Sequence, residues 1–321
     1  MKPVIHLGID PDSYPEGAVA AVEAMAPDYD VLVTTDRAEI ERHLDRIEVS
    51  LARFPHELLP AARSLRWLQQ AGAGADWLES HDEVRSLDFT LTNASGVHAV
   101  PISEHMLAFL LALGRGLPAS IRGQKERVWE ENRSQDLFEL AEKRVLVLGV
   151  GAIGARFAKL CAACDMEVVG VRRDPSVPAE GVARMVGMEA LHEELARADV
   201  LANTLPLTNE TRGLIGRKEF ALLNDGAVVI NIGRGATMDE QAMIDALRSG
   251  KLRAAGLDVF ETEPLPESSP LWEMEQVVMT PHYSGLTPRY NERVFEIFRD
   301  NLGRYLRGEP LRNVVDKQIG Y

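Results

Sequence analysis

The stretch VLVLGVGAIGARFAKL, residues 145–160, decides how the chain folds. It begins as a short apolar run, passes through Gly149, Gly151 and Gly154 in the spacing G-x-G-x-x-G, and continues in a helical pattern. Gly149 permits a tight turn, Gly151 lets the backbone approach a pyrophosphate, and Gly154 allows a helix to pack closely on a strand. The first N–H groups of that helix would face the anion. The pattern predicts a strand, turn and helix that bind a dinucleotide, and the alternative is an ordinary strand-to-helix turn.

The next predicted strand runs out into two positive charges, in the segment EVVGVRRDPS at residues 167–176. An acidic side chain at the end of this strand binds the ribose hydroxyls and disfavours a 2′-phosphate. Arg172 lies there instead, 18 residues after Gly154, and Arg173 follows it. Guanidinium groups suit a phosphate dianion, so the pair predicts a preference for NADP(H). Asp174 lies beyond the strand and is poorly placed to replace the acid, and two solvated surface arginines are the alternative reading.

Outward from this segment, short apolar runs alternate with helical patterns along the whole chain. The strand candidates are VIHLGI, DVLVTT, IEVSLA, LRWLQQ and FTLTNA in the first part, and RVLVLG, MEVVGV, DVLANTL, AVVINI, LRAAGLDV and QVVMT in the second. This alternation is typical of parallel strands joined by crossover helices. We therefore expect an α/β protein with two doubly wound parallel sheets and a ligand bound between the halves.

Two longer helices are predicted outside these series. VPISEHMLAFLLALGRG, residues 100–116, is apolar on nearly all sides, which indicates deep burial or a subunit interface. Residues 287–308, TPRYNERVFEIFRDNLGRYLRG, form the last helical stretch.

Composition and charge narrow the possible partners. The chain has 321 residues, of which 45% are hydrophobic, and this length suggests roughly two domains. The 49 acidic residues outnumber the 35 basic ones, for a net charge of −14, which argues against nucleic acid and anionic membranes as partners.

Cys161 and Cys164 lie in an apolar helical run, so we expect them to pack in a core rather than to perform redox chemistry, and no metal site is predicted. The N-terminal residues lack the apolar run of a signal peptide, so a cytoplasmic location is expected.

Several linked motifs carry a family resemblance. VLGVGAIG, NTLPLTNETRGLI, the segment at 225–266 with INIGRG and LDVFETEPLP, and VVMTPHYSG occur in that order, after QQAGAGADW and LTNASGVHAVPISEHMLAFLLALGRG. Together they resemble the D-isomer-specific 2-hydroxyacid dehydrogenases, a group that includes glyoxylate/hydroxypyruvate reductases. The resemblance implies a flavodoxin-like substrate domain, residues 1–99 and 287–321, with a Rossmann cofactor domain, residues 100–286, inserted into it. It also implies a homodimer to which the helix after Pro101 contributes.

In that family an Arg, a Glu and a His perform the chemistry, and the matching residues here are Arg234, Glu263 and His282. Reduction of a 2-oxo acid adds a hydride to the carbonyl carbon and a proton to its oxygen, and a histidine suits the proton transfer. Glu263 would orient the His282 ring and favour the imidazolium form. Arg234 would hold the substrate carboxylate and polarise the carbonyl. Taken singly, each could equally be a solvated loop residue.

The resemblance assigns further contacts, several of which have a structural alternative. Ala73 and Gly74 would bind the substrate carboxylate through backbone N–H groups, or simply form a turn. Arg53 would meet a second acidic group of the substrate, or be a surface residue. Asp258 would hold the nicotinamide carboxamide or cap a strand, and Met106 would touch the nicotinamide or belong to the core. The other cofactor-binding residues expected around the motifs are Ala152, Ile153, Leu205, Pro206, Thr211, Ile232, Gly233 and Ser284.

The expected function is reduction of a small 2-oxo acid, such as glyoxylate or hydroxypyruvate, with NADP(H) preferred and NAD(H) possible. Two alternatives remain open. One is an NAD-linked enzyme similar to 3-phosphoglycerate dehydrogenase, which the paired arginines and the absence of an added regulatory domain disfavour. The other is a dinucleotide-sensing protein similar to a corepressor, which a turnover assay with 2-oxo acids would separate from an enzyme.

Overall fold

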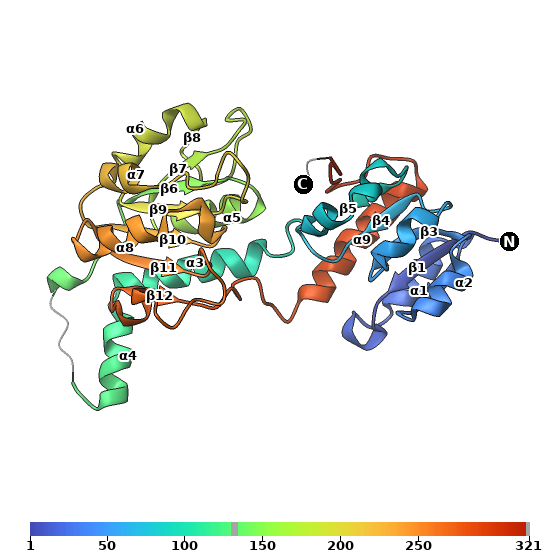
Figure 1. Ribbon diagram of the computed structural model, residues 1–321, viewed down its shortest axis with the longest axis horizontal. Helices are drawn as coiled ribbons and strands as arrows, with labels where there is room; N and C mark the ends of the chain where they lie inside the picture. Colours follow the sequence, from blue (N-terminus) through green and yellow to red (C-terminus); the bar gives the residue numbers. More distant parts are fainter. Residues whose placement is uncertain (130–133, 319–321) are drawn as a thin grey trace. The chain divides into compact units, whose positions relative to one another are not determined.

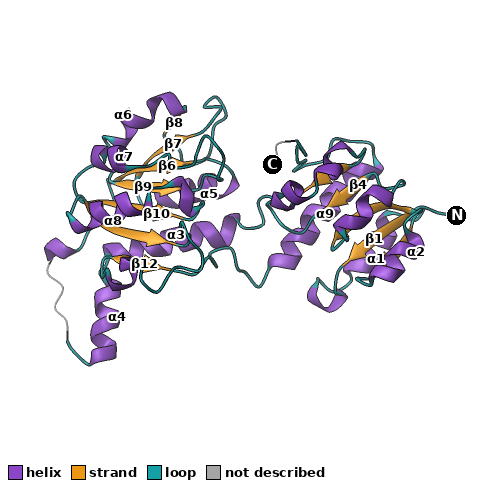
Figure 2. Cartoon of the chain, viewed as in Figure 1, coloured by secondary structure: helices purple, strands orange, loops and turns teal. Residues whose placement is uncertain are grey.

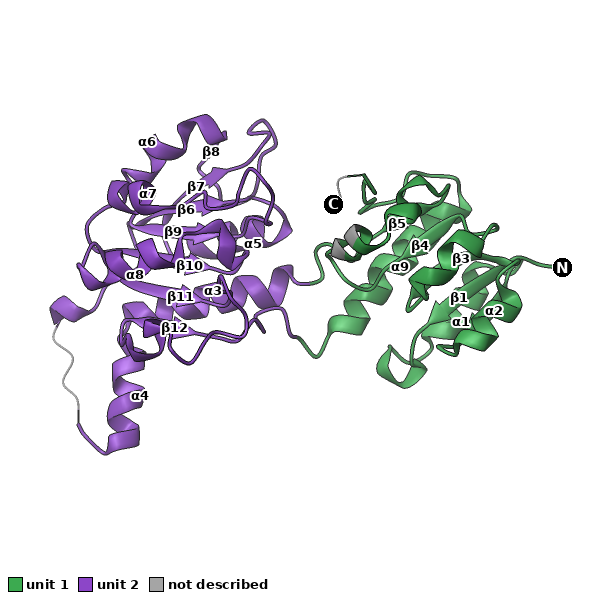
Figure 3. Cartoon of the chain, viewed as in Figure 1, with its two compact units in different colours: residues 1–97, 287–321 green, residues 98–286 purple. Residues whose placement is uncertain are grey.

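The computed structural model of the protein describes residues 1–129 and 134–318. The chain divides into two compact units, drawn in separate colours in Figure 3. Unit 1 contains residues 1–97 and 287–321, and unit 2 contains residues 98–286. The chain therefore leaves unit 1 after Val97 and returns to it at Thr287.

Unit 1 is built on a sheet of parallel strands in the order β2-β1-β3-β4-β5. The strands are β1 (Val4–Gly8), β2 (Asp30–Val33), β3 (Ile47–Ala52), β4 (Trp67–Gln69) and β5 (Thr90–Thr92). This is the flavodoxin-like strand order, in which the direction of winding reverses between β1 and β3.

Helices cover both faces of the unit 1 sheet (Figure 2). They are α1 (Ala18–Met25), α2 (Arg37–His43), α9 (Tyr290–Leu306) and the short 3-10 helices η1 (Pro11–Ser13), η2 (His56–Ala61), η3 (Asp76–Ser80) and η4 (Asp82–Ser86). The C-terminal helix α9 belongs to this unit because its apolar side packs on the sheet. Trp67 of β4 stacks on Phe298 of α9 with ring centres 5.2 Å apart, and Tyr305 donates a hydrogen bond to Glu48 at 2.7 Å.

Unit 2 has a larger parallel sheet, in the order β12-β11-β10-β9-β6-β7-β8 (Figure 1). Its strands are β6 (Arg144–Leu148), β7 (Glu167–Val171), β8 (Arg184–Val186), β9 (Val200–Asn203), β10 (Ala227–Asn231), β11 (Leu252–Leu257) and β12 (Val277–Met279). Winding starts at β6, runs outward through β7 to β8, and then returns to β9 on the other side. Ligands of such sheets bind beyond the carboxyl ends of the strands at this reversal.

Most of the helices of unit 2 lie in two layers around the sheet. They are α3 (Ala99–Gly114), α4 (Leu117–Glu126), α5 (Ala152–Ala162), α6 (Leu191–Leu195), α7 (Arg217–Leu222), α8 (Glu240–Arg248) and the 3-10 helices η5 (Ser134–Asp136), η6 (Met188–Ala190), η7 (Gly235–Thr237) and η8 (Pro270–Glu273). Helices α3 and α5 share one core with the sheet, and α6, α7 and α8 share the other.

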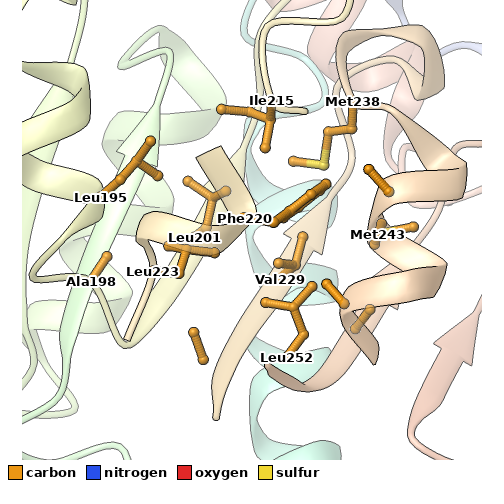
Figure 4. Close-up of a cluster of buried hydrophobic side chains, with 14 of the residues drawn as sticks. Leu195, Ala198, Leu201, Ile215, Phe220, Leu223, Val229, Met238, Met243 and Leu252 are labelled. Atoms are coloured by element: carbon orange, nitrogen blue, oxygen red, sulfur yellow. The ribbon is translucent and has the colours of Figure 1, made fainter. Parts of the chain in front are cut away.

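Alternation along the strands explains the two cores. In β6, Leu146 and Leu148 face the layer of α6 to α8, whereas Val145 and Val147 face α3 and α5. Successive side chains of a strand point to opposite faces, and a sheet covered on both sides therefore has continuous apolar strands. Figure 4 shows part of the first core, where Phe220 of α7 lies among Leu201, Val229 and Met243.

The fold class expected from the sequence is confirmed, and each predicted strand contains an observed one. Neither β8 nor α4 was predicted, and α4 follows a break at Gly116 where φ is 65°. Both cysteines are unpaired thiols, Cys161 is buried in a core cluster, and burial raises the pKa of its thiol.

No single helix within residues 1–129 and 134–318 is long and apolar enough to cross a membrane. Helices α3 and α4 reach the length and hydropathy of a membrane span only when the two are taken together, across a bend of 70°.

Candidate active site

The predicted residues of unit 2 gather at one edge of its sheet, where the parallel strands end. Arg172 follows β7, the glycine turn follows β6, and Leu205 follows β9. Arg234, Asp258 and His282 follow β10, β11 and β12 in turn. Neighbouring strands are about 4.8 Å apart, so the edge offers an extended row of sites roughly 25 Å long between β7 and β12.

The glycine turn after β6 has the geometry that the motif requires. Gly149 has φ of 87°, in the left-handed region that favours glycine. A Cβ on Gly154 would lie 2.1 Å from the Gly149 carbonyl oxygen, so only glycine lets α5 start so close to the strand. A Cβ on Gly151 would meet nothing within 4 Å. The turn is closed where it packs on the protein and open in front of Gly151.

Helix α5 begins at Ala152, directly behind that open position. Ala152 is exposed and Ile153 is half-buried. The first N–H groups of a helix have no partner within it, and the positive end of its dipole points the same way. The residues present therefore fit a pyrophosphate.

The two arginines after β7 are accessible, as binding of a phosphate would need. Arg172 is half-buried, and its backbone N–H donates to the Val186 carbonyl at 3.1 Å. Arg173 is exposed and lies 3.9 Å from the Glu210 carboxylate. Asp174 is turned toward Ser176, whose hydroxyl and N–H donate to it at 2.6 and 3.0 Å. These bonds, with a smaller contribution from Arg172, lower the pKa of Asp174.

His282 and Glu263 form a hydrogen-bonded pair. The distance from His282 Nδ1 to Glu263 Oε2 is 2.7 Å, and the two side chains are 48% and 35% exposed. The other oxygen of Glu263 accepts the N–H of Phe260 at 2.9 Å, which fixes the carboxylate. Within the described residues, His282 Nε2 has no hydrogen-bond partner. The ring is thus held from one side and offers its second nitrogen to a ligand.

The backbone of His282 is held in an unusual conformation. Its φ is 53°, in the left-handed region, where a non-glycine residue costs on the order of 1–3 kcal/mol. Its N–H is shared between the carbonyls of Asp258 and Thr280, at 2.9 and 3.0 Å. Such strain persists where the surroundings impose it, and it concentrates at functional sites.

Arg234 reaches the same region through a tight backbone contact. It precedes η7, it is exposed, and its Nη1 donates to the Gly233 carbonyl at 2.8 Å. A Cβ on Gly235 would lie 1.9 Å from the Phe260 carbonyl carbon, so these two loops touch. Since Phe260 also holds Glu263, the loop of Arg234 is adjacent to the loop that fixes the His282 ring.

Asp258 is the buried anchor of this region, with only 1% of its surface exposed. Its Oδ1 accepts the Thr280 hydroxyl at 2.6 Å and the N–H groups of Tyr283 and Ser284 at 3.0 and 3.2 Å. Its Oδ2 accepts only the Ser284 N–H, at 3.1 Å, among the described residues. One oxygen is therefore saturated and the other can still accept a hydrogen bond.

The loop after β9 lines the glycine turn. Leu205 lies beside Gly149, where its Cδ2 would be 3.1 Å from an added Cβ. The Thr211 hydroxyl donates to the Pro206 carbonyl at 2.6 Å and so closes the loop on itself. Gly233 packs against the backbone of Leu205, since a Cβ there would lie 2.5 Å from its carbonyl oxygen.

Three predicted cofactor contacts are largely covered by protein. Met106 of α3 is fully buried in the core shared with α5, which favours the packing alternative over a contact with nicotinamide. Ile232 is 5% exposed in the same core, and Ser284 is also 5% exposed. A direct side-chain contact with a ligand needs accessible surface, which Met106 lacks.

The predicted substrate residues Arg53, Ala73 and Gly74 lie in unit 1, at the carboxyl ends of its strands. Arg53 is exposed just after β3, and Gly74 is exposed in the loop after β4. Asn93 Nδ2 donates to the Ala73 carbonyl at 2.7 Å.

Two residues that hold this loop were not predicted from the sequence. Gln70 is buried, and its Nε2 donates to the carbonyls of Gly72, at 3.0 Å, and Gly74. Trp77 Nε1 donates to Gln70 Oε1 at 2.9 Å, and the Trp77 ring stacks on His56 with centres 3.8 Å apart. No sequence pattern predicts that a glutamine side chain will donate hydrogen bonds to the carbonyls two and four residues after it. In the described part of the chain, no group of His, Cys, Asp and Glu side chains is arranged to hold a metal ion.

Comparison with known proteins gives the family of this fold and site. Residues 107–284, which lie inside unit 2, match the sequence model of the D-isomer specific 2-hydroxyacid dehydrogenase NAD binding domain. The chain belongs to the D-isomer specific 2-hydroxyacid dehydrogenase family. The matched domain is the one that carries the glycine turn, so the cofactor class of this family, a nicotinamide dinucleotide, corresponds to the turn observed here.

Members of this family with known names fall into different groups. The chain is 32% identical over 307 residues to the D-3-phosphoglycerate dehydrogenase of Archaeoglobus fulgidus. The aligned residues cover 94% of this chain and 57% of that relative. It is also 32% identical to the glyoxylate/hydroxypyruvate reductase B of Yersinia pestis, and there the aligned residues cover 91% of this chain and 90% of the relative. The chain thus spans about half the length of the curated phosphoglycerate dehydrogenases it matches, and nearly the full length of the reductase.

A solved structure gives the same picture. The D-isomer specific 2-hydroxyacid dehydrogenase of Xanthobacter autotrophicus Py2, in complex with NADPH and MES, has a TM-score of 0.79 with 33% identity and covers all of both chains. The resemblance predicted from the sequence motifs is therefore confirmed.

Proposed function

We propose that the protein reduces small 2-oxo acids to D-2-hydroxy acids, with glyoxylate or hydroxypyruvate as substrates and NADP(H) as the preferred cofactor. The observation that carries the proposal is the 2.7 Å pair of His282 and Glu263, at the same strand edge as Arg234 and the glycine turn. The overall reaction takes a hydride and a proton to a carbonyl. The cofactor, when bound, supplies the hydride.

His282 supplies the proton in this proposal. Because Nδ1 is engaged with Glu263, Nε2 is the nitrogen that faces the substrate. The proton leaves Nε2 for the carbonyl oxygen as the hydride reaches the carbonyl carbon, and in the reverse direction Nε2 accepts it. Glu263 keeps the ring oriented and stabilises the charged form.

Arg234 binds the substrate carboxylate and stabilises the charge that develops on the carbonyl oxygen. Its planar fork matches a carboxylate in a way that a lysine ammonium does not. Among the described residues, only Nη1 of Arg234 has a partner, the Gly233 carbonyl. The other guanidinium nitrogens are therefore available to a ligand. In unit 1, the loop at Ala73 and Gly74 would offer backbone N–H groups to a substrate, and Arg53 would offer a positive charge.

The cofactor would bind along the strand edge of unit 2. Gly151, Ala152, Ile153 and Gly154 would receive the pyrophosphate, and the free Oδ2 of Asp258 would accept the carboxamide N–H. Arg172 and Arg173 would receive the 2′-phosphate, while the Asp174 carboxylate is hydrogen-bonded to Ser176. The NADPH complex of the Xanthobacter relative supports this preference.

A second candidate is oxidation of 3-phosphoglycerate, which the similarity to the Archaeoglobus enzyme favours. Arg53 would then meet the substrate phosphate. The paired arginines after β7 argue against the NAD linkage that we expect for such an enzyme.

The test is a substrate panel run with NADPH and with NADH. We expect glyoxylate and hydroxypyruvate to be reduced with NADPH at a higher kcat/KM than with NADH. Arg172→Asp should reverse the cofactor preference, with Lys218→Asp, an exposed charge on α7, as the matched control. Turnover of 3-phosphoglycerate above that of the 2-oxo acids would favour the second candidate, and a strong NADH preference of the wild type would contradict the role of the arginines.

We also propose that the protein is a homodimer. Leu117 and Ile121 of α4 and the following Trp129 are 47%, 64% and 91% exposed, which is unusual for large apolar side chains. The sedimentation coefficient in analytical ultracentrifugation tests this, and a monomer at micromolar concentration would contradict it.

A further inference from the structure

His105 of α3 is joined through the side chain of Thr280 to the catalytic loop, residues 280–284, which carries His282. Its Nε2 lies 3.0 Å from the Thr280 hydroxyl oxygen, and Thr280 lies 2.6 Å from Asp258 Oδ1. Asp258 in turn accepts the N–H groups of Tyr283 and Ser284. A continuous chain of hydrogen bonds therefore runs from a helix of the core to both sides of His282.

The direction of each hydrogen bond follows from the groups involved. Asp258 is an acceptor, so the single O–H of Thr280 points at it, and the Thr280 oxygen must accept the N–H of His105 Nε2. Burial lowers the pKa of His105, and the nearby carboxylate of Asp258 only partly opposes this. The two hydrogen bonds therefore place a hydrogen on His105 Nε2.

The His105 ring is also fixed by packing. It meets the rings of Phe109 and Tyr283 edge-on, with centres 4.5 and 5.7 Å apart. Phe109 is buried on the same helix, and Tyr283 follows His282 in the catalytic loop. The ring therefore cannot turn away from Thr280 without losing both contacts.

This arrangement bears on His282 because that residue has a strained backbone. Its φ of 53° is maintained by the bonds of its N–H to Asp258 and Thr280 and by the clamp on the two residues after it. Every one of these bonds ends on Asp258 or Thr280. What orients Thr280 therefore also helps to impose the conformation of His282.

We propose that His105 is a positioning residue, which donates to Thr280, fixes the Asp258 clamp and thereby holds His282 in the orientation that transfers the proton. The inference rests on the proposed function. Without the donor, the Thr280 hydroxyl can rotate away from Asp258, and the loop gains alternative conformations. The loss should fall on the chemical step, because Arg234 and the glycine turn are held by other contacts.

The test separates hydrogen bonding from packing. His105→Phe keeps a ring against Phe109 and Tyr283 but removes the donor, whereas His105→Gln keeps an N–H at nearly the same reach. We expect His105→Phe to lower kcat about tenfold, since small misplacements of reacting groups are costly. The KM for the 2-oxo acid should change less than about twofold, and His105→Gln should recover most of the rate. Glu104→Gln, an exposed neighbour on α3, is the control and should match the wild type.

A double-mutant cycle with Thr280→Val tests the route. If His105 acts through Thr280, the double variant should be no slower than the slower single variant. Additive losses, or a His105→Phe variant with wild-type kcat, would overturn the inference. If His105→Phe does not fold, His105→Leu, which also removes the donor, takes its place and should lose rate as Thr280→Val does. A His105→Leu variant with the wild-type kcat would overturn the inference.

A failed function is distinguishable from a failed inference. If the wild type reduces none of the 2-oxo acids with either cofactor, the proposed function is wrong, and the link is then read from the ring ¹⁵N chemical shifts of His282. A shift in His105→Phe that is absent in His105→Gln would support the positioning role. Unchanged His282 signals in His105→Phe would overturn it.

Discussion

The carboxyl ends of β1 in unit 1 and of β6 in unit 2 occupy equivalent places, since each strand lies next to the reversal of its own sheet. Strand β1 ends on Gly8, and β6 is followed by the glycine turn, yet Gly8 and Gly151 of that turn have opposite surroundings. A Cβ on Gly8 would lie 2.2 Å from the Arg53 carbonyl oxygen, whereas a Cβ on Gly151 would meet nothing. In unit 1 the glycine makes room for the protein's own backbone, and in unit 2 it leaves room for a ligand.

The comparison shows that a doubly wound sheet does not by itself make a dinucleotide site. The strand edge of unit 1 is closed at β1 and offers the loop at Ala73 and Gly74 instead. The strand edge of unit 2 is open at the start of α5 and carries His282 and Arg234 farther along. We infer that the same architecture is used once for the substrate and once for the cofactor.

A large effect on kcat/KM is expected when the cation at the strand edge of unit 2 is removed. Arg234→Ala should lower kcat/KM for the 2-oxo acid about 10²–10³-fold, because it removes a fixed donor from the developing charge. Arg234→Lys should recover only part of this, since it restores the charge without the fork. Steady-state kinetics with hydroxypyruvate and NADPH measure both. Equal rates for the Lys and Arg forms would show that the fork is not used.

In unit 1, Gly8→Ala should lower the free energy of unfolding and leave cofactor binding unchanged. The added methyl group meets the Arg53 backbone at 2.2 Å, and overpacking of this kind costs about 1–3 kcal/mol. Thermal unfolding followed by circular dichroism should show a lower Tm. NADPH affinity, measured by fluorescence, should stay at the wild-type value, and a variant with wild-type Tm would contradict the close approach.

The converse is expected for Gly151→Ala. The methyl group enters open space, and the backbone at φ of −87° and ψ of −158° is one that alanine adopts, so Tm should not change. It would occupy the place of the pyrophosphate and weaken NADPH binding about tenfold, or about 1.4 kcal/mol. The dissociation constant from fluorescence titration measures this. A variant that binds NADPH normally would show that the cofactor does not approach Gly151.

These two glycines mark how far sequence reasoning reaches. The spacing at 149–154 predicted the turn, the start of the helix and the open face correctly, because each depends on residues within one strand-turn-helix unit. The strands were predicted because sheets covered on both faces need apolar runs. The strand β8, Arg184–Val186, was missed because it is an edge strand only three residues long.

Contacts between distant residues could not be predicted. The pair of His282 and Glu263 came from a family resemblance, but the clamp of Asp258 on Tyr283 and Ser284 joins residues 25 and 26 positions apart. His105 lies 175 positions from Thr280. For Met106, the residue beside it, the sequence left open a contact with the nicotinamide or a place in the core, because helical position alone does not tell which face meets the core; it is fully buried.

The smallest effect is expected in unit 1, from Trp77→Phe. The variant keeps a ring over His56 but loses the bond from Nε1 to Gln70, and with it part of the brace on the loop of Ala73 and Gly74. One such hydrogen bond is worth about 0.5–1.5 kcal/mol, so KM for the 2-oxo acid should rise about threefold to tenfold. The kcat should stay near the wild-type value. A change in kcat alone would place Trp77 outside substrate binding.

The most direct measurement of the central claim is the single-turnover rate of hydroxypyruvate reduction by wild type and His282→Ala, both saturated with NADPH. His192→Ala, which removes an exposed histidine paired with Glu219, is the matched control. We predict that His282→Ala slows the chemical step about 10²–10⁴-fold while NADPH still binds, and that the control is unchanged. A His282→Ala variant that reduces the 2-oxo acid at the wild-type rate would contradict the assignment of His282 as the proton donor.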